Sequence, residues 1–418
     1  MTMVDLTNAY PLRRLKYICR FQYGDALPLG VRQDGVVPVF GSNGIFGQHN
    51  AANMIGPSIV IGRKGSYGKV TWSDCDGFCI DTAFFVDRRS TNANLRWLYY
   101  ALQTLGLDTE SRDAAVPGLS REDAYNKICV FPSLITQEFV ASFLDEHVGA
   151  IDKAIERNQR LIKAIQEERN VMIARAVTRG LDPNVNMKES GVAWFGLVPA
   201  HWRMTKIKHI SEKVVDCLHT TPTYDGQVKY PAIRTADVEP GKILIEQARL
   251  VSEEVYLERI NRLRPMAGDI LYSREGERFG IAALVPDGAE LCLGQRMMMF
   301  RIKQNVYSKY IMWLLNSPPI YQQVIEKNAG STSPHINIQE VINFEIALPG
   351  IEEQKNIAKY VEVNYGISEE IIRKCKEMTR VLQEYSSTLI TAVITGQIDV
   401  TSRTAHRTVV AELERLGA

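Results

Sequence analysis

Two stretches of the sequence resemble each other in length, in composition and in the way they begin. The first, Pro132–Thr178, reads PSLITQEFVASFLDEHVGAIDKAIERNQRLIKAIQEERNVMIARAVT. The second, Pro349–Thr395, reads PGIEEQKNIAKYVEVNYGISEEIIRKCKEMTRVLQEYSSTLITAVIT. Beyond its first two residues, each stretch lacks proline and contains a single glycine. Apolar residues recur in both at every third or fourth position, which predicts two long amphipathic helices.

The apolar positions form one stripe on each predicted helix. Asn158 and Arg169 interrupt the first stripe, like the polar core residues that fix register in coiled coils. Gly180 and Pro183 end the first helix. An antiparallel pair of such helices would span about 65 Å at 1.5 Å per residue. The stripes consist of Ile151, Ile155, Ile162, Ile165, Met172 and Ala176, and of Ile371, Cys375, Met378, Leu382, Tyr385, Leu389 and Ala392.

The two stretches also align with each other without gaps, which indicates an internal duplication. Identical residues fall at matching positions: Pro132 and Pro349, Gln137 and Gln354, Ala141 and Ala358, Gly149 and Gly366, Ile155 and Ile372, Gln166 and Gln383, Glu167 and Glu384, Thr178 and Thr395, Asp182 and Asp399. Upstream of each helix the residues diverge, although Arg63 and Arg274 still match. The helices have therefore changed less than the segments that precede them.

Each helix follows a stretch rich in Gly, Val, Ile and aromatic residues with short alternating runs, which is typical of strands and turns. We therefore expect an α+β fold, with two mainly β domains separated by two long antiparallel helices and related by a pseudo-two-fold internal repeat. The expected boundaries are 1–132 for the first β domain, 133–180 for the first helical region, 181–206 for a linker, 207–348 for the second β domain, 349–400 for the second helical region and 401–418 for a C-terminal tail.

Composition excludes several classes of protein. The chain has 418 residues, 45% of them hydrophobic and 23% charged, as in ordinary folded proteins. Because the net charge is only +1, a polyanionic partner would have to bind local basic patches. No apolar run reaches about 18 residues and no signal peptide precedes the first domain, so we expect a cytoplasmic protein. Seven scattered cysteines predict reduced thiols, and Cys75 and Cys79 lack the second pair that a zinc site would need.

Eight segments, in their order along the chain, resemble the specificity subunit of Type I restriction-modification systems. GLVPAHW is similar to the signature between that family's two modules, and FPSLITQ and LPGIEEQ resemble the openings of its two helical regions. The other segments resemble two classes of its target-recognition domain. They are VFGSNGIFGQHN (Val39–Asn50), IVIGRKGSYGKVTW (Ile59–Trp72), YPAIRTADV, GDILYSREG and LCLGQRMMMFRIK. The first module departs from the pattern, because Tyr10-Pro11-Leu12 opens it without a Gly-x-x-Pro-x-x-Trp phrase.

The resemblance implies a non-catalytic subunit in which each β domain, as a target-recognition domain, reads one half of a bipartite double-stranded DNA site. The helices would set the spacer and dock two methyltransferase subunits. It implies no cofactor on this chain. S-adenosylmethionine would be bound by the methyltransferase partner, and ATP and magnesium by the two restriction subunits that could join the complex.

The candidate DNA-binding residues lie on turns that combine cations with planar donors and acceptors, because cations contact phosphates and planar groups read base edges. In the first module they are Ser42, Asn43, Arg63, Lys64, Ser66, Tyr67 and Lys69. In the second they are Arg274, Glu275, Glu277, Arg278, Gln295 and Arg296, with a further loop that contributes Ser331, Thr332 and His335.

Two alternatives remain open at this point: a self-contained DNA methyltransferase or nuclease, and a coiled-coil adaptor without DNA specificity. Ser317-Pro318-Pro319-Ile320 resembles the motif of amino-methyltransferases, but Ile320 cannot stack on a flipped base as an aromatic residue does. Gly62–Lys69 has one residue too many between its outer glycines for a phosphate-binding loop, and its lysine is followed by Val70 rather than a hydroxyl residue.

Overall fold

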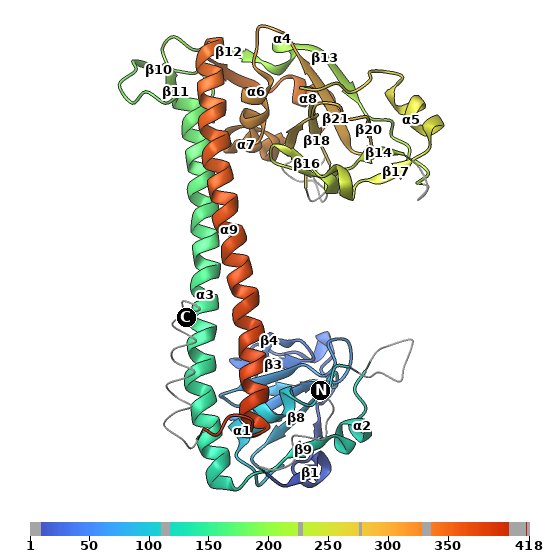
Figure 1. Ribbon diagram of the computed structural model, residues 1–418, viewed down its shortest axis with the longest axis vertical. Helices are drawn as coiled ribbons and strands as arrows, with labels where there is room; N and C mark the ends of the chain where they lie inside the picture. Colours follow the sequence, from blue (N-terminus) through green and yellow to red (C-terminus); the bar gives the residue numbers. More distant parts are fainter. Residues whose placement is uncertain are drawn as a thin grey trace. The chain divides into compact units, whose positions relative to one another are not determined.

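The computed structural model describes residues 10–109, 118–224, 229–275, 278–327, 336–400 and 415. The chain divides into two compact units. Unit 1 contains Met1–Arg160 and Cys375–Ala418, and unit 2 contains Leu161–Lys374. Each unit combines one mainly β module with part of both long helices, α3 (Leu134–Arg179) and α9 (Ile351–Ile394) (Figure 1).

The module of unit 1 contains two small sheets. Its elements are β1 (Leu12–Arg14), η1 (Leu15–Tyr17), β2 (Gln22–Tyr23), η2 (Leu29–Val31), β3 (Val37–Gly41), β4 (Gly44–His49), β5 (Ser58–Gly62), β6 (Val70–Ser73), β7 (Phe78–Cys79), β8 (Ala83–Asp87), α1 (Leu95–Gln103), α2 (Arg121–Asn126) and β9 (Ile128–Val130). A four-stranded antiparallel sheet has the order β2-β8-β5-β6. A three-stranded sheet has the order β4-β3-β7, in which β3 and β7 are parallel.

Unit 2 is built in the same way. Its elements are β10 (Met187–Glu189), β11 (Leu197–Pro199), β12 (Arg203–Lys206), α4 (Ile207–Ile210), β13 (Ser211–Asp216), β14 (Tyr230–Ile233), η3 (Thr235–Asp237), β15 (Val238–Glu239), β16 (Lys242–Ile243), η4 (Ile245–Gln247), β17 (Arg249–Val251), α5 (Glu253–Ile260), β18 (Ile270–Ser273), β19 (Ala282–Leu284), β20 (Cys292–Leu293), β21 (Met297–Ile302), α6 (Ser308–Leu315), α7 (Pro318–Lys327), α8 (Ile338–Ile342) and β22 (Glu345–Leu348). The four-stranded sheet has the order β13-β21-β18-β19, and the three-stranded sheet β17-β14-β20 again contains one parallel pair, β14 with β20.

The two modules therefore share one topology, and the duplication predicted from the helices extends through the β domains. Strand β2 corresponds to β13, β8 to β21, β5 to β18 and β6 to β19. In the second sheet β4, β3 and β7 correspond to β17, β14 and β20. Each module also has a corresponding antiparallel pair, β1 with β9 or β12 with β22. Unit 2 has two further antiparallel pairs, β10 with β11 and β15 with β16, for which the described strands of unit 1 contain no counterpart. The expected α+β fold with an internal repeat is confirmed.

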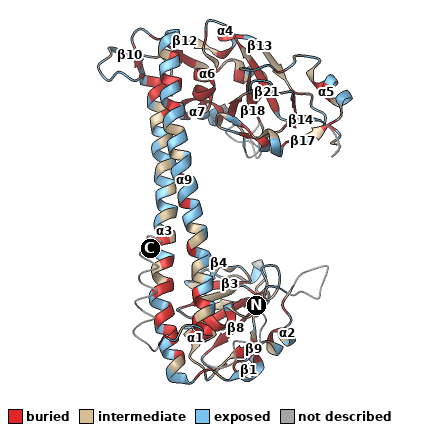
Figure 2. Ribbon diagram, viewed as in Figure 1, coloured by how far each residue is buried: buried red, intermediate tan, exposed pale blue. Residues whose placement is uncertain are grey.

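The strands β5, β8 and β18 of the four-stranded sheets are buried on both faces, and alternate residues face different layers. On β5 of unit 1, Ile59 and Ile61 pack in the helical core with Trp97, whereas Val60 packs with Phe40 of the three-stranded sheet. In unit 2 the same alternation sends Ile270 and Tyr272 toward the helices and Leu271 toward Ile233. Figure 2 shows the buried residues in red along these strands. Each module thus has three layers: helices, a four-stranded sheet and a three-stranded sheet.

Within each unit the two long helices run antiparallel and share the core of the module. Ile151 of α3 and Leu389 of α9 belong to the core of unit 1, and Val177 and Ile357 to that of unit 2. Arg169, the polar residue in the first stripe, has partners on the other helix: its guanidinium pairs with Glu369 and lies 4.4 Å from the ring centre of Tyr365. An arginine that covers an aromatic ring with its plane can occupy a helix seam without an unpaired charge.

The linker before the second β domain is attached to the first turn of α9. Trp202 is 1% exposed and donates from Nε1 to Glu353 Oε1 at 3.0 Å. The other carboxylate oxygen of Glu353 lies 2.8 Å from His201 Nε2. Lys188 of β10 donates to the carbonyl of Trp202 at 2.7 Å. The GLVPAHW segment is therefore a structural anchor in which the indole nitrogen, which needs a partner once buried, finds one on the helix.

One buried glutamine joins each module to the start of its long helix. Gln137 accepts from Asn94 N at 2.8 Å and donates to Pro132 O at 2.9 Å. Gln354 accepts from Tyr307 N at 2.8 Å and donates to Pro349 O at 2.8 Å. Each side chain is 1% exposed. The aligned glutamines thus tie the N-cap of α1 or α6 to the proline that precedes α3 or α9.

We predict that Gln137→Ala and Gln354→Ala each lower the free energy of unfolding by about 2–4 kcal/mol. The reason is that each removal leaves a buried N–H and a buried C=O without a partner. Urea unfolding followed by circular dichroism measures the change. Gln166→Ala, on the exposed surface of α3, is the matched control. A loss below about 0.5 kcal/mol for both buried positions, within the range of surface substitutions, would contradict this role.

Candidate nucleic-acid interface

In the first module the candidate residues gather where two hairpin turns meet. Ser42 and Asn43 form the two-residue turn between β3 and β4, and residues 63–69 form the turn between β5 and β6. Lys69 Nζ lies 2.9 Å from Asn43 O and 2.9 Å from Asn43 Oδ1, and so joins the two turns. The structure brings together all seven residues that the sequence singled out in this module.

Gly62 allows the two turns to approach each other. A Cβ atom at this position would lie 2.1 Å from the carbonyl oxygen of Ser66 and 2.9 Å from that of Ser42. Any side chain would therefore separate the turns. The glycine-rich sequence around Arg63 is explained by this close approach, and the loop is the turn of a β-hairpin rather than a strand-to-helix phosphate loop.

The residues of this turn differ in how accessible they are. Lys64, Ser66 and Lys69 are exposed, whereas Tyr67 is half-buried against the core of the module. Arg63 is also half-buried: its guanidinium lies 5.1 Å from the ring centre of Tyr23 and donates to Asp81 O at 3.2 Å. A turn with exposed lysines over a braced scaffold suits contact with phosphates.

Sequence reasoning missed Tyr23 and Arg121 beside this turn. Arg121, the first residue of α2, also lies near the ring of Tyr23, with its guanidinium carbon 4.9 Å from the ring centre. Tyr23 therefore has two guanidinium groups within cation–π distance. The three residues come from distant parts of the chain, and no local spacing could have revealed that they meet.

In the second module Arg274 is not an exposed DNA contact. It is 2% exposed, and its Nε donates to Asp216 Oδ1 at 3.0 Å while NH1 lies 2.9 Å from Glu275 Oε1. NH2 lies 3.4 Å from His219 Nδ1, and His219 Nε2 lies 3.1 Å from Asp216 Oδ2. The base contact expected from the sequence does not fit this burial. A buried guanidinium next to two carboxylates is instead a structural group that holds three segments together.

The other described candidates of this module lie around Arg274. Arg278 is exposed and donates to the carbonyls of Ala236 at 3.2 Å and Val238 at 3.1 Å. Gln295 donates to Thr221 Oγ1 at 2.6 Å. The Arg296 side chain is 57% exposed and lies 3.7 Å from Glu275 Oε2. Glu277, Ser331, Thr332 and His335 lie outside the described residues.

Arg296 also has an unusual backbone. Its φ of 67° is in the left-handed region, which non-glycine residues rarely adopt. The carbonyl of Arg296 accepts from Arg274 N at 3.1 Å, so the buried arginine helps to hold this conformation. Backbone strain of this kind persists where the surroundings impose it and is concentrated at functional sites.

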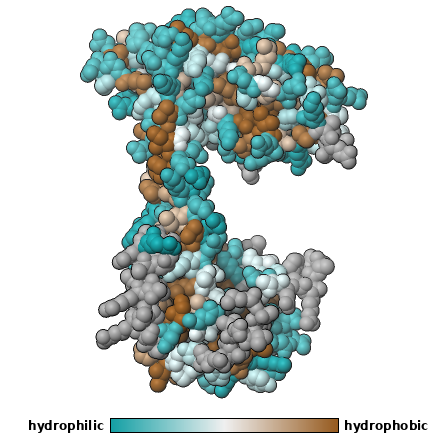
Figure 3. Space-filling model, in the orientation of Figure 1, coloured by the Kyte–Doolittle hydropathy of each residue, from teal (hydrophilic) through white to brown (hydrophobic). Residues whose placement is uncertain are grey.

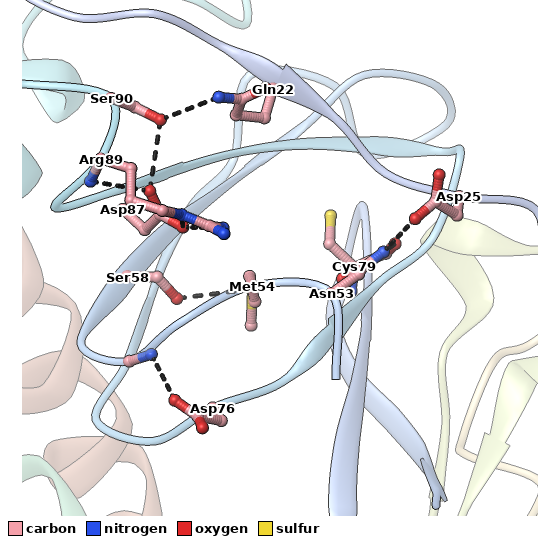
Figure 4. Close-up of polar contacts among 11 residues, drawn as sticks. Gln22, Asp25, Asn53, Met54, Ser58, Asp76, Cys79, Asp87, Arg89 and Ser90 are labelled. Atoms are coloured by element: carbon pink, nitrogen blue, oxygen red, sulfur yellow. Dashed lines mark hydrogen bonds and ion pairs between the residues drawn. The ribbon is translucent and has the colours of Figure 1, made fainter. Parts of the chain in front are cut away.

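In each module a side chain bonds the backbone carbonyl just before one loop. The loop is β7–β8 in the first module and β20–β21 in the second. In the first module Asn53 donates to Cys79 O at 2.9 Å and accepts from Cys79 N at 2.7 Å, and it also bonds Asp25 at 2.8 Å (Figure 4). In the second module the buried Arg259 of α5 donates to Leu293 O at 3.0 Å and to Thr220 O at 2.6 Å. Neither residue stood out in the sequence.

The geometry does not favour chemistry on this chain at the motifs considered above. Ser317 and Ile320 are each 0% exposed, and the Ser317 hydroxyl donates to Leu314 O at 2.5 Å, so neither residue can face a flipped base. Burial raises the pKa of the Cys79 thiol to about 12. The described residues contain no group of three or more His, Cys, Asp or Glu side chains placed to hold a metal ion, and none of their helices is long and apolar enough to cross a membrane.

Comparisons with known proteins agree with this architecture. A family model described as the Type I restriction modification DNA specificity domain matches residues 199–377. The chain is 19% identical to the Type I restriction enzyme EcoBI specificity subunit of Escherichia coli over 407 residues, which cover 95% of this chain and 85% of that protein. It is 24% identical to the Type I restriction enzyme MjaVIII specificity subunit of Methanocaldococcus jannaschii over 315 residues, which cover 73% of this chain and 70% of that protein.

The fold is also similar to one that has been solved. A chain in a structure of the type I R-M system matches with a TM-score of 0.66 and 14% sequence identity, over 93% of this chain and 98% of the other. The family model, the two relatives and the duplicated fold point to the same group of proteins. Over most of its length the chain is therefore similar to the specificity subunits of Type I restriction-modification systems.

Proposed function

We propose that this chain is the sequence-specific DNA-recognition subunit of a Type I restriction-modification complex, in which each β module reads one half of a bipartite site. The observation that carries the proposal is the combination of one duplicated scaffold with two different sets of loop residues. The sheet orders are the same in both modules, but the turns present Lys64 and Lys69 in one and Arg278 and Arg296 in the other. Two different half-sites require such a pair of surfaces.

Affinity and specificity would come from different residues of these turns. Exposed lysines neutralise phosphates and release counterions whatever the base sequence. Planar side chains select bases, since arginine pairs with guanine and glutamine with adenine in the major groove. Lys64 fits the first role, and Gln295 and Arg296 fit the second.

We further propose that the chain is not itself an enzyme and that two methyltransferase subunits dock on its helical regions. Both long helices carry exposed large hydrophobic side chains, and Figure 3 shows brown patches along the helices on one face; such surfaces favour protein partners. On α3 they are Leu134, Ile135, Phe139, Leu161 and Val171, and on α9 Ile351, Tyr360, Val363, Ile367, Ile371 and Met378. The partners would supply the S-adenosylmethionine chemistry, and two restriction subunits would join them for cleavage.

We predict that Lys64→Ala weakens binding of the methyltransferase complex to specific and non-specific DNA by a similar factor. The slope of log affinity against log salt concentration should fall by about 1, because one phosphate contact is lost. Fluorescence anisotropy over a salt series measures both. Lys16→Ala is the control, because Lys16 follows β1, which lies at the far end of unit 1 from β3 and β4 (Figure 1). An unchanged slope would remove Lys64 from the interface.

Two substitutions, Arg296→Gly and Arg296→Ala, together test whether the Arg296 side chain reads bases or only supports the packing of the loop. Glycine should relieve a backbone cost of about 1 kcal/mol, so this variant should be more stable to heat than Arg296→Ala, which keeps the strain. Both should lose the base preference of the second half-site and keep that of the first, as measured by selection from randomised duplexes. Retention of the second half-site by both variants would contradict a role in reading bases.

Helix length should determine the spacing of the two half-sites, because α3 and α9 each contribute to both units. Inserting seven helix-forming residues after Arg160 and seven after Lys374 adds about 10 Å to each helix. Since one turn of duplex is about 34 Å, the recognised spacer should lengthen by about 3 base pairs. Sequencing of modified bases reads the spacer. The same seven residues placed after the exposed Gly191 are the control and should leave the spacer unchanged. An unchanged spacer after the helix insertions would show that the helices do not measure it.

A further inference from the structure

The loop that carries Gln295 and Arg296 has a counterpart in the first module that no sequence motif revealed. Three residues, Gly294–Arg296, connect β20 of the three-stranded sheet to β21 of the four-stranded sheet. In the first module three residues, Ile80–Thr82, connect β7 to β8, which occupy the corresponding places in the two sheets. The connection has the same length and joins the same layers.

The same backbone hydrogen bonds hold both loops. At the start, Ile80 N donates to Phe40 O at 2.9 Å, and in the second module Gly294 N donates to Ile233 O at 2.7 Å. At the end, the carbonyl of Thr82 accepts from Arg63 N at 2.9 Å, as that of Arg296 accepts from Arg274 N at 3.1 Å. These bonds align Asp81 with Gln295 and Thr82 with Arg296.

The surroundings of the two loops correspond as well. The carbonyl just before each loop is held by a side chain, Asn53 in the first module and Arg259 in the second. Arg63 and Arg274, whose backbone N–H groups hold the two loops, also accept a hydrogen bond at their own carbonyls from the segment that leads into the next helix. In unit 1, Leu119 N donates to Arg63 O at 2.8 Å. In unit 2 the equivalent donor to Arg274 O is Ile336 N, at 3.1 Å. A loop fixed by so many bonds can present a side chain in one orientation, as base readout requires.

The side chains of the first loop can make different contacts from those of the second. Asp81 is exposed and Thr82 is partly exposed. Arg63 bonds the Asp81 carbonyl at 3.2 Å, which places a cation close to the loop for a neighbouring phosphate. A carboxylate accepts from the exocyclic amino group of cytosine, and a threonine hydroxyl bonds either kind of base edge. The backbones differ in one respect, since Thr82 lacks the left-handed φ of Arg296.

We propose that Ile80–Thr82 is the base-reading loop of the first module, with Asp81 accepting from a cytosine amino group in the first half-site. The proposal rests on the proposed function of the chain. It deepens that function by naming a specificity-determining residue and the base that it selects. The proposal also gives two segments of the first module different roles. The β5–β6 turn that carries Lys64 contacts phosphate, and the β7–β8 loop reads the base.

The test uses the full chain in complex with its methyltransferase subunits and selects bound duplexes from a pool in which both half-sites are randomised. Asp81→Asn keeps the size of the side chain but offers an amide, which pairs with adenine. One position of the first half-site should change from cytosine toward adenine by about tenfold, and Asp81→Ala should lose the preference there. The second half-site should stay the same in both variants and so reports that the complex is folded.

Asp34→Asn is the matched control, because it removes the same charge from an exposed residue near the end of the β3–β4 hairpin away from its turn. It should leave both half-sites unchanged. Selection of the wild-type first half-site by both Asp81 variants would overturn the proposal while leaving the proposed function intact. Loss of both half-sites together would also overturn it, because the loop would then be structural. A wild-type complex that selects no bipartite site would instead refute the proposed function.

Discussion

The arrangement of each module on its helices depends on one buried primary amide. A glutamine side chain can satisfy a backbone donor and a backbone acceptor at once, provided that the two groups lie a fixed distance apart. Gln137 does this between Asn94 N and Pro132 O, and Gln354 does it between Tyr307 N and Pro349 O. Because the amides are buried, neither group can turn to water instead. Each β module is thereby held to its long helix in one orientation.

The same constraint explains what the sequence could predict. The helices followed from their three- and four-residue periodicity, and the duplication followed from identical residues at matching positions, among them Gln137 and Gln354. These glutamines recur because each has the same two backbone partners. The aligned threonines also have one role, since Thr178 and Thr395 each donate to the carbonyl four residues earlier, both at 2.7 Å. Where packing fixes a side chain, the duplicated copies retain their resemblance.

The candidate site was only partly predictable, for a physical reason. Arg63 and Arg274 align, and both follow the central strand of a sheet beside a glycine-rich turn. The sequence could not show that one guanidinium rests on an aromatic ring while the other is buried between carboxylates. That difference is set by Tyr23 and Asp216, which end equivalent strands but share no chemistry. Asp81 and Thr82 were missed because their likeness to Gln295 and Arg296 lies in backbone bonds rather than in residue type.

The buried residues that hold the loops in place are not the exposed residues proposed to read bases. The two modules can therefore diverge in their loop residues without unfolding. Removing one partner of a buried ion pair such as Arg274 with Asp216 leaves an unpaired charge and destabilises a protein by about 3–5 kcal/mol. The exposed positions around it can change at little cost, since surface substitutions stay within about 0.5 kcal/mol. A buried framework of backbone bonds, amides and paired charges therefore keeps the loops at fixed places while their exposed side chains change. Two copies of such a framework on one chain can accept different half-sites, because nothing in the framework specifies which bases the loops read.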